Sequence, residues 1–302
     1  MQMAEDLRHP GHLLMAENHC LKTLNLANQQ TSLVVGNSYI AGYREGSGGS
    51  ARFNILSGFE QINSSHVLIT DVYNHCIRLL DRSTNTTTTI AGVCGWSGHR
   101  DGPLTSARFN TPFKIIRLPN TDRYLISDYG NLLIRELNLA TGQVSTFVNT
   151  TEKPNALLLS RDGSSVFFSW FKGIGEVNLL TKQVTFLTSP DKKYYGFRDG
   201  PASRAVFHRV EEMVYLNDNL ILMTDLRNNV LRLFNIRNKY VTTICNTGNS
   251  TVSGTIETCQ MRVPRSLLVQ PSRNRVLIGC VEYIGYLNIR GRLSYNHNVI
   301  KQ

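Results

Sequence analysis

Apolar residues in this chain occur in short runs, and clusters of Gly, Asn, Asp and Ser separate the runs. Stretches such as "HVLITD" (66–71) and "CIRLLD" (76–81) combine β-branched and aliphatic residues between turn-forming residues. This pattern is typical of β-strands joined by tight turns. No apolar pattern with a 3.6-residue period extends over a useful length, so the sequence predicts an all-β protein.

An internal repeat organises these strands. The five residues "SARFN" occur at Ser50–Asn54 and again at Ser106–Asn110, 56 positions further on, and the same shift superposes "NHCLK" (18–22) on "NHCIR" (74–78). Repeats of this length indicate a solenoid or a propeller. Aligning the apolar runs gives six units of four strands, which predicts a six-bladed β-propeller with four antiparallel strands per blade.

The 302 residues are predicted to form one propeller domain over 1–302, because a repeat architecture can hold this length in one body. By register, the first strand of blade one falls before about Leu7, so this strand is expected to be short or incomplete. Five or seven blades would contradict the repeat count.

The repeated segments resemble the NHL repeat, which is named for an Asn-His-Leu signature. The signature stands at 18–21 (Asn-His-Cys-Leu) and 74–77 (Asn-His-Cys-Ile), and weaker forms begin at Asn131 and Asn229. The segment "AGVCGWSGHRDGPLTSARFNTPFKI" (91–115) is similar to the link between blades in that family. The resemblance covers most of the chain and implies an NHL-type six-bladed propeller.

Residues that recur in each blade are interpreted as structural. An aspartate that ends the second strand can accept backbone N–H groups in the following turn, and an arginine seven residues later is expected to pair with it. A glycine in each blade link suits a backbone conformation that other residues avoid, and a phenylalanine is expected to fill the seam between blades. These sets are Asp71, Asp128 and Asp225; Arg78, Arg135 and Arg232; Gly46, Gly102 and Gly200; and Phe53, Phe109 and Phe207.

Six cysteines occur, at positions 20, 76, 94, 245, 259 and 280, without CxxC pairs or a zinc-like spacing. An even count permits disulfides. Cys245 and Cys259 bracket the polar segment "NTGNSTVSGTIET" and are predicted to form a disulfide if the protein matures in an oxidising compartment. Cys20 and Cys76 share one repeated strand position and are interpreted as small buried residues.

The formal net charge of +10 favours acidic partners such as nucleic acid, sulfated glycan, anionic lipid or an acidic protein face. The basic residues are scattered, so charge alone raises the nucleic-acid interpretation only modestly. No apolar run approaches the length of a membrane span, and no membrane insertion of this segment is expected. The polar opening "MQMAEDLRHP" lacks the pattern of a secretory signal.

Four glycosylation sequons begin at Asn63, Asn85, Asn149 and Asn249. Random placement gives roughly four in a chain of this composition, so the sequons do not decide whether the protein is glycosylated. The segment between Cys245 and Cys259 and the lack of tripartite-motif features favour an extracellular or cell-surface location, with a cytoplasmic one as the alternative.

Catalysis on a repeat scaffold needs residues that break the repeat and converge. His19 and His75 are paired by the repeat, and the predicted first strands contain no histidine set. NHL-type propellers include a peptide-amidating lyase that holds its metal with inner-strand histidines, which this sequence does not offer. An enzyme, whether lyase-like or lactonase-like, is therefore the least favoured interpretation, and we expect no metal or cofactor.

The turns between second and third strands and the links between blades are expected to lie on one face. The candidate partner-binding residues there are Trp96, Arg100, Trp170, Phe171, Lys172, Tyr195 and Arg198. Exposed aromatics beside arginine are typical of interaction hot spots. Blade four motivates this choice, because it replaces the aspartate of the turn with "SWFKG" (169–173); the alternative is that Trp170 fills the seam to the next blade.

The sequence favours a non-enzymatic interaction domain that binds a protein or acidic glycan through this face. RNA binding, as in NHL domains of tripartite-motif proteins, is the alternative, because bases can stack on rings while phosphates contact cations. The chain shows no RING, B-box or coiled coil that would favour it.

Overall fold

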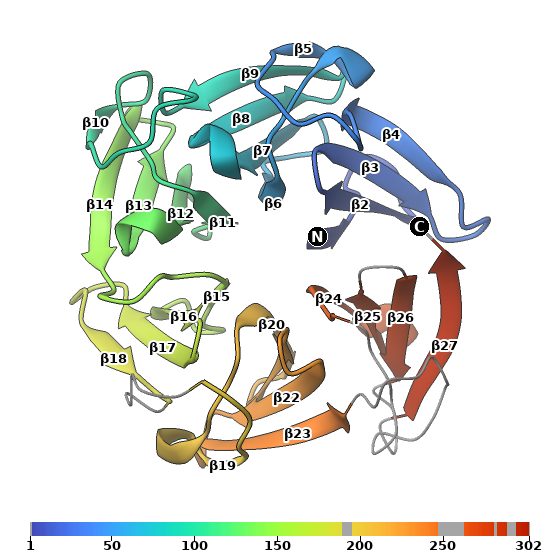
Figure 1. The fold of residues 1–302 in the computed structure, drawn as a ribbon, viewed down its shortest axis with the longest axis vertical. Helices are drawn as coiled ribbons and strands as arrows, with labels where there is room; N and C mark the ends of the chain where they lie inside the picture. The colour runs from blue at the N-terminus through green and yellow to red at the C-terminus, as the bar shows by residue number, and fades with distance from the viewer. Residues whose placement is uncertain (1, 189–194, 247–262, 281–282, 289–293, 302) are drawn as a thin grey trace. The chain divides into compact units, whose positions relative to one another are not determined.

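The structure is a computed structural model that describes residues 2–188, 195–246, 263–280, 283–288 and 294–301. The described residues form six antiparallel sheets (Figure 1). The chain is an all-β, six-bladed propeller, which confirms the predicted fold class and blade count. Two compact units, Met1–Leu157 and Leu158–Gln302, are described separately below, and a single domain over 1–302 stays a prediction.

Unit 1 contains blades one to three. Its strands are β1 (Gln2–Glu5), β2 (His12–Glu17), β3 (Cys20–Asn25), β4 (Thr31–Gly36), β5 (Gly46–Ser47), β6 (Leu56–Gln61), β7 (His66–Asp71), β8 (Cys76–Asp81), β9 (Thr86–Ala91), β10 (Gly102–Pro103), β11 (Pro112–Arg117), β12 (Arg123–Asp128), β13 (Leu133–Asn138) and β14 (Gln143–Asn149). The strand orders are β1-β2-β3-β4, β5-β9-β8-β7-β6 and β10-β14-β13-β12-β11. β1 has four residues, two fewer than β6 and β11.

Unit 2 contains blades four to six, with β15 beginning at the boundary residue. Its strands are β15 (Leu157–Leu159), β16 (Ser165–Trp170), β17 (Gly173–Asn178), β18 (Val184–Phe186), β19 (Gly200–Pro201), β20 (Val210–Asn217), β21 (Leu220–Asp225), β22 (Val230–Asn235), β23 (Tyr240–Asn246), β24 (Ser266–Gln270), β25 (Arg275–Gly279), β26 (Tyr283–Asn288) and β27 (Ser294–Lys301). The orders are β15-β16-β17-β18, β19-β23-β22-β21-β20 and β24-β25-β26-β27.

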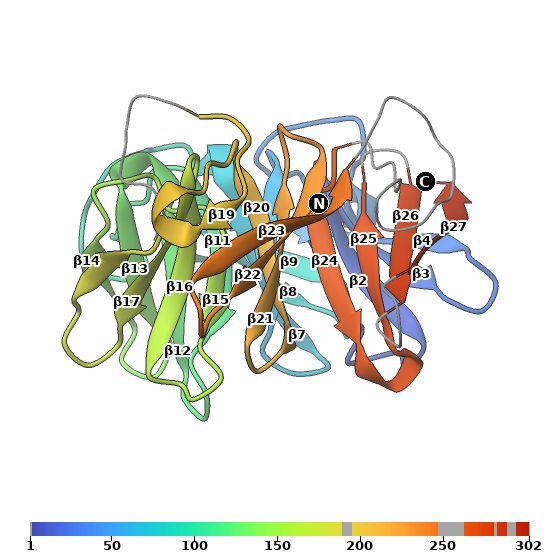
Figure 2. The same ribbon diagram turned by 90° about the horizontal axis from the view of Figure 1, so that it is seen from below.

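Short 3₁₀ turns are the only helical elements in these described ranges. They are η1 (Gly48–Ser50), η2 (Val72–Asn74), η3 (Tyr129–Asn131), η4 (Ala202–Arg204) and η5 (Pro271–Arg273). η2 and η3 directly follow the aspartates that end β7 and β12, and each passes into a residue with positive φ, His75 at 59° and Leu132 at 62°. Figure 2 shows the strands from the side, with turns and links at their two ends.

The blade links carry the short strands β5, β10 and β19, which add to the last strand of the following blade. Gly46, Gly102 and Gly200 begin these strands with φ of +133°, +130° and +126°. Side chains with a Cβ rarely adopt this conformation, so the prediction that these glycines meet a backbone requirement is confirmed.

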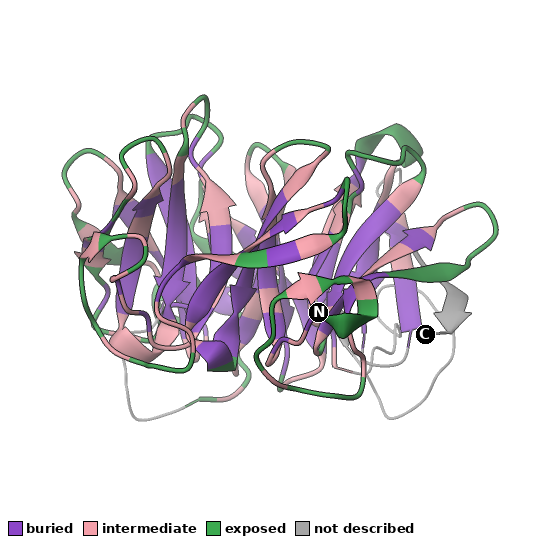
Figure 3. Ribbon diagram, turned by 90° about the horizontal axis from the view of Figure 1, so that it is seen from above, coloured by how far each residue is buried: buried purple, intermediate pink, exposed green. Residues whose placement is uncertain are grey.

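The hydrophobic core lies between neighbouring sheets. In unit 1, one cluster joins Leu14 and Val35 of blade one to Val67 and Ile69 of blade two, with the fully buried Phe53 among them. A second cluster places Phe109 between blades two and three. Buried residues therefore concentrate in the strands, while exposed residues occupy turns and links (Figure 3), and the seam role predicted for these phenylalanines is confirmed.

Candidate functional site

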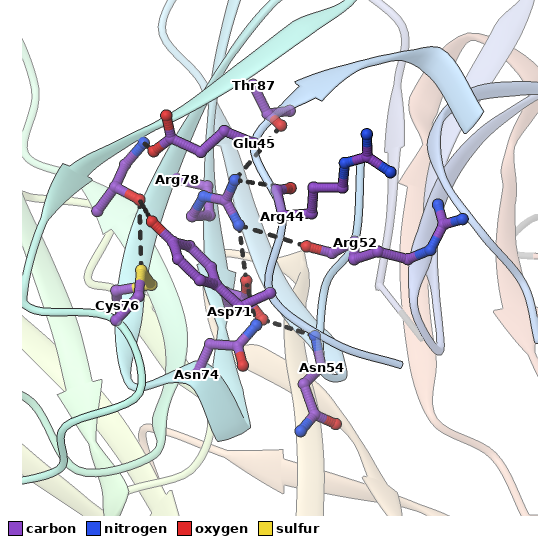
Figure 4. The surroundings of a disulfide bond; sticks show 12 residues. Arg44, Glu45, Arg52, Asn54, Asp71, Asn74, Cys76, Arg78 and Thr87 are labelled. Atoms are coloured by element: carbon purple, nitrogen blue, oxygen red, sulfur yellow. Dashed lines mark hydrogen bonds and ion pairs between the residues drawn. A yellow bond between two sulfur atoms is a disulfide. The ribbon is translucent and has the colours of Figure 1, made fainter. Parts of the chain in front are cut away.

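A buried aspartate holds the turn between β7 and β8 to the preceding blade link. Asp71 Oδ1 accepts the backbone N–H of Asn54 at 2.8 Å, and Oδ2 accepts Asn74 Nδ2 at 2.9 Å and Arg78 Nη1 at 3.1 Å (Figure 4). The side chains of Asp71 and Arg78 are fully buried. Such a pair is tolerated in the interior because each charge is matched and hydrogen-bonded.

The same arrangement recurs in the other two blades that carry the aspartate. Arg135 pairs with Asp128 and Arg232 pairs with Asp225, both at 2.9 Å. The backbone N–H groups of Asn110 and His208 bind the second carboxylate oxygen at 2.7 and 2.8 Å. The predicted ion pairs and backbone contacts are therefore confirmed.

The buried arginine also fastens the link by its backbone. Arg78 donates to the carbonyl oxygens of Arg52 (3.4 Å) and Arg44 (3.3 Å). In blade three, Arg135 donates in the same way to Arg108 and Arg100, both at 3.0 Å. The links are thus held in one conformation by the blade beneath them.

The signature histidines join each blade to the next one. Nδ1 of His19 accepts the backbone N–H of Ile55, and Nδ1 of His75 accepts that of Thr111, both at 3.1 Å. Burial lowers the pKa of both imidazoles, which favours the neutral form that this acceptor role requires. These contacts explain the repeat of the histidine by structure alone.

The cysteines behave differently from the interpretation based on sequence. Cys76 forms a disulfide with Cys94, with the two Cα atoms 5.1 Å apart, so the expectation that Cys76 is merely a small buried residue is wrong. Cys20, at the same position of blade one, is buried and outside any disulfide. Its Sγ lies 3.3 Å from Ser38 Oγ, and Ser38 is the residue that the repeat aligns with Cys94.

The predicted Cys245–Cys259 disulfide lies outside the described residues, because Cys259 falls in 247–262 and the structure gives only the backbone of Cys245, in β23. It stays a prediction.

Trp170 does not present its ring to solvent. The residue is 3% exposed, and its ring packs edge-on against Phe186 with centroids 4.9 Å apart and lies 5.8 Å from Phe168. It occupies the strand position of Asp71 and Asp128, which is buried in those blades too. The expectation that this ring is available to a partner is therefore wrong, and the alternative of a packing role holds.

Blade four lacks the buried aspartate–arginine ion pair. Gly175 lies where blades two, three and five have their arginine, and a Cβ there would come within 2.6 Å of the Phe168 ring. Aromatic rings thus fill the volume of both charged side chains. Trp170 pairs directly with Gly173, which shortens the turn to Phe171 and Lys172.

In unit 1, Trp96 and Arg100 occupy the link between blades two and three. Trp96 is 64% exposed and Arg100 is exposed. The disulfide at Cys94 anchors the start of this segment to β8, and the guanidinium of Arg108 lies 5.9 Å from the centroid of the Trp96 ring. The indole is therefore held in place while much of its surface remains open to solvent.

In unit 2, three rings from separate segments of blades four and five meet. Phe171 comes from the β16–β17 turn, Tyr195 from the blade link and His208 from the residues before β20. The centroid distances are 5.8 Å for Phe171–Tyr195, 5.1 Å for Phe171–His208 and 4.5 Å for Tyr195–His208. We call Phe171, Tyr195 and His208 the ring cluster.

Tyr195 is 59% exposed, so the ring cluster reaches the surface. Burial and the nearby Arg227 lower the pKa of His208 against the opposing effect of Asp225, which keeps this ring neutral near pH 7. Arg198, three residues after Tyr195, is exposed, and Lys172, which follows Phe171, is half-buried. The cluster thus offers the exposed ring of Tyr195, supported by two further rings, with cationic side chains nearby in the sequence.

The sequence interpretation missed His208 and Arg108. His208 replaces Asn54 and Asn110 of the repeat, and this departure was the available signal. Arg108 was regarded only as part of the repeated "SARFN".

A separate pocket in unit 1 lies at the opposite end of the strands from the β7–β8 turn. Its volume is about 290 Å³, and Arg8, His9, Arg82 and Ser83 help to line it. Burial raises the pKa of Asp6, but hydrogen bonds from Arg82, the Arg8 backbone and His9 outweigh it and lower the pKa to about 2. Arg82 is thus neutralised by Asp6, and no carboxylate among the described residues forms an ion pair with Arg8.

The residues that the structure describes contain no candidate metal site and no candidate membrane helix. No group of three or more His, Cys, Asp or Glu side chains in these ranges is placed to hold a metal ion. No helix there has the length and hydrophobicity of a membrane span.

Solved structures with a similar fold define the class of this chain. An auxiliary nutrient binding protein from Bacteroides thetaiotaomicron superposes with a TM-score of 0.70 at 12% identity, over 92% of this chain and 66% of that one. A chain of the Nidogen/Laminin complex gives 0.62 at 10% identity, over 92% of this chain and 89% of that one. At such identities the likeness shows the fold alone, that of a β-propeller.

Sequence relatives narrow the class, although no family model matches. The chain is 28% identical over 139 residues to NHL repeat-containing protein 2 of Bos taurus, and 27% identical over 152 residues to Protein SUPPRESSOR OF QUENCHING 1, chloroplastic, of Arabidopsis thaliana. These matches cover 44% and 48% of this chain but only 19% and 14% of the relatives. The chain is a six-bladed propeller that is similar over part of its length to an NHL repeat-containing protein, which confirms the resemblance.

Proposed function

We propose that this chain is a non-enzymatic interaction domain that binds a protein or acidic glycan partner through its strand 2–3 turns and blade links. The binding residues in this proposal are Trp96 and Arg100 in unit 1 and Phe171, Lys172, Tyr195 and Arg198 in unit 2. Trp170 is left out because its ring is buried.

The ring cluster is the observation that carries the proposal. Blades two and three have Asn54 and Asn110 at the position of His208, and they form the same backbone contact to the turn aspartate without it. The fold therefore does not require an aromatic ring at this position. Partly exposed aromatic residues with arginine nearby are the composition of binding hot spots.

Two further observations support the proposal. The auxiliary nutrient binding protein and the matched chain of the Nidogen/Laminin complex both have this fold, and the names of both structures refer to binding. Disulfides such as Cys76–Cys94 persist in oxidising compartments, which favours a secreted or cell-surface protein.

The proposal is tested by binding of the purified chain to an array of extracellular-matrix proteins, glycans and single-stranded poly(U) RNA. We expect saturable binding to a protein or an acidic glycan, weakened at least about tenfold by Tyr195→Ala, as for loss of a hot-spot residue. Leu180→Ala is the control, because Leu180 is 88% exposed in the β17–β18 turn at the other end of β17.

Equal binding by wild type, Tyr195→Ala and Leu180→Ala would contradict the proposed site. Saturable binding to poly(U) alone, weakened by Tyr195→Ala, would overturn the partner class in favour of RNA.

A further inference from the structure

Two pairs of arginines lie directly opposite each other in the blade links of unit 1. Arg44 and Arg52 exchange both backbone hydrogen bonds, at 3.3 and 3.0 Å, and Arg100 and Arg108 do the same at 3.4 and 3.0 Å. Residues paired in this way have Cα atoms about 5.5 Å apart and side chains on the same side. We call Arg44, Arg52, Arg100 and Arg108 the link arginines.

Like charges directly opposite each other destabilise a strand pair. Among the residues that the structure describes, no carboxylate lies within ion-pair distance of a link arginine. Arg52 Nη1 instead donates to the carbonyl oxygens of Gly49 and Ala51. The repulsion within each pair is therefore not relieved by acidic residues.

Blade five shows that the fold does not require arginine at the positions of Arg52 and Arg108, although it keeps an arginine, Arg198, at the position of Arg44 and Arg100. There Val206 lies opposite Arg198 and makes the same two backbone hydrogen bonds, at 3.2 and 3.0 Å. Arg232 donates to both carbonyl oxygens in the same way as Arg78 and Arg135. The backbone bridge performs the structural role at the positions of Arg52 and Arg108, and these two arginine side chains need another explanation.

The guanidinium groups of the link arginines extend away from the buried pair. Figure 4 shows the side chains of Arg44 and Arg52 running side by side, away from Arg78 and Asp71. In the next link, Arg108 lies against the Cα of Gly98, where a Cβ would be 3.2 Å from its Cδ, and over the ring of Trp96. Each pair therefore presents two cationic groups on one side of the link, and contacts within the link hold one side chain of each pair, Arg52 or Arg108.

Guanidinium groups bind the oxygens of sulfate and phosphate bidentately, which distinguishes them from lysine. The partner that fits is thus a polyanion with closely spaced groups of this kind. A single-stranded nucleic acid would add base stacking on open aromatic faces. The two rings beside these arginines are already covered on one side, Trp96 by Arg108 and Tyr43 by Arg78, with centroid distances of 5.9 and 5.1 Å.

We propose that the link arginines of unit 1 form a binding surface for a sulfated polysaccharide. The proposal rests on the proposed function and names the partner class within it. The two pairs follow the repeat from one blade link to the next, so a linear polymer with regularly placed sulfates can contact both. Trp96 contributes by orienting Arg108.

The test measures binding to immobilised heparin at several salt concentrations. Arg44→Ala/Arg100→Ala removes the two exposed link arginines and keeps the carbonyl oxygens that Arg78 and Arg135 use. We expect affinity to fall about tenfold, as for the loss of two exposed ion pairs, with a weaker dependence on salt. Arg237→Ala/Arg273→Ala is the control, since it removes two exposed arginines from strand turns outside the links. It should bind as wild type does.

Desulfated heparin and poly(U) complete the design. Desulfated heparin should fail to bind, and poly(U) should compete poorly. Equal losses in both double variants would show that only net charge matters and would overturn the proposal. Tight poly(U) binding that Arg44→Ala/Arg100→Ala abolishes would also overturn it, in favour of RNA.

The two proposals fail differently. Unchanged heparin binding in Arg44→Ala/Arg100→Ala overturns this inference, but it leaves the proposed function standing if Tyr195→Ala still weakens binding to an array partner. Absence of saturable binding to heparin and to every array component overturns both. Thermal melting of each variant checks that the fold is kept.

Discussion

At the scale of single residues, blades two to five fill the last position of the second strand in two ways. Asp71, Asp128 and Asp225 satisfy this buried position with an arginine and backbone N–H groups. Blade four satisfies it with Trp170 packed among aromatic rings and a glycine opposite. Replacing both partners of a buried ion pair by apolar groups is often neutral or stabilising, whereas removing one partner is costly. The exchange in blade four is complete, and it leaves no unpaired charge.

Trp170→Ala should therefore act on stability. We expect it to lower the free energy of unfolding by about 3–5 kcal/mol, because truncation leaves a cavity between Phe168 and Phe186. Thermal and denaturant unfolding measure the effect. Lys172→Ala, in the adjacent turn, is the control and should change stability little. An unchanged melting temperature for the tryptophan variant would contradict the packing role.

Glu60 is a residue whose ionisation opposes folding. Burial raises its pKa from 4.5 to about 7, although the charges of Lys114 and Arg117 partly counteract this effect. The folded state therefore binds the proton more tightly than the unfolded state does. Stability associated with this group is present below about pH 4.5 and is lost as the pH rises to about 7.

Glu60→Gln should accordingly stabilise the protein at pH 8 and not at pH 5. We expect a gain of about 2 kcal/mol at pH 8, from the raised pKa, and a higher melting temperature there. Glu45→Gln is the control: burial raises the pKa of Glu45, but hydrogen bonds from Thr89 outweigh it and lower the pKa, so its loss should not stabilise. Equal effects of Glu60→Gln at both pH values would show that its charge is not penalised in the fold.

At the scale of elements, the sequence predicted the features that the repeat imposes. The apolar runs predicted the strands, and the spacing of Asp71 and Arg78 predicted their pair, because a seven-residue separation spans a hairpin with a four-residue turn. The repeat aligns Trp170 with Asp71 and Asp128, but the neighbouring turn residues gave no sign that its ring is buried. Burial depends on Phe186, which belongs to a strand two elements away.

The Cys76–Cys94 disulfide was not predicted from the sequence, for a different reason. Blade one has Cys20 at the repeated position but no second cysteine. The cysteine at this position was therefore interpreted as a residue that packs within each blade. The partner is brought near by the pairing of β8 with β9, which includes a register shift between Ile77 and Arg78. The link arginines were also missed, because the sequence interpretation assigned a structural role to every residue that recurs in the repeat.

Blade one allows a direct test of whether its link can form the same disulfide as the link of blade two. Cys20 and Ser38 occupy the positions of Cys76 and Cys94, with Sγ and Oγ 3.3 Å apart. Ser38→Cys should form a second disulfide under oxidising conditions and stabilise the protein by about 3 kcal/mol, the typical value for a loop of this size. Thiol counting by mass spectrometry and thermal unfolding check both effects.

The matched control is Cys20→Ser/Ser38→Cys, which has the new thiol without its partner and should gain nothing. Persistence of free thiols at positions 20 and 38 after oxidation would show that the two blades hold this segment differently.

At the scale of the whole molecule, stability within unit 1 is shared between blades through the seams. One buried cluster contains side chains of blades one and two, and another contains side chains of blades two and three. Blade two contributes to both clusters, for example through Val67 to the first and Leu68 to the second, which point to opposite faces of β7. In repeat proteins such contacts between neighbours make the repeats unfold together.

Phe53→Ala should therefore destabilise all three blades of unit 1 although Phe53 touches only the first seam. Truncating this fully buried ring should cost about 3–5 kcal/mol, and hydrogen exchange of the slowest amides should accelerate by about 100-fold or more if they exchange through a shared opening. We expect the acceleration in β3, β8 and β13, one strand from each blade. Tyr39→Ala is the control, since Tyr39 is 94% exposed in the neighbouring link. Acceleration confined to β3 and β8 would show that the second seam isolates blade three, and that unit 1 opens one blade pair at a time.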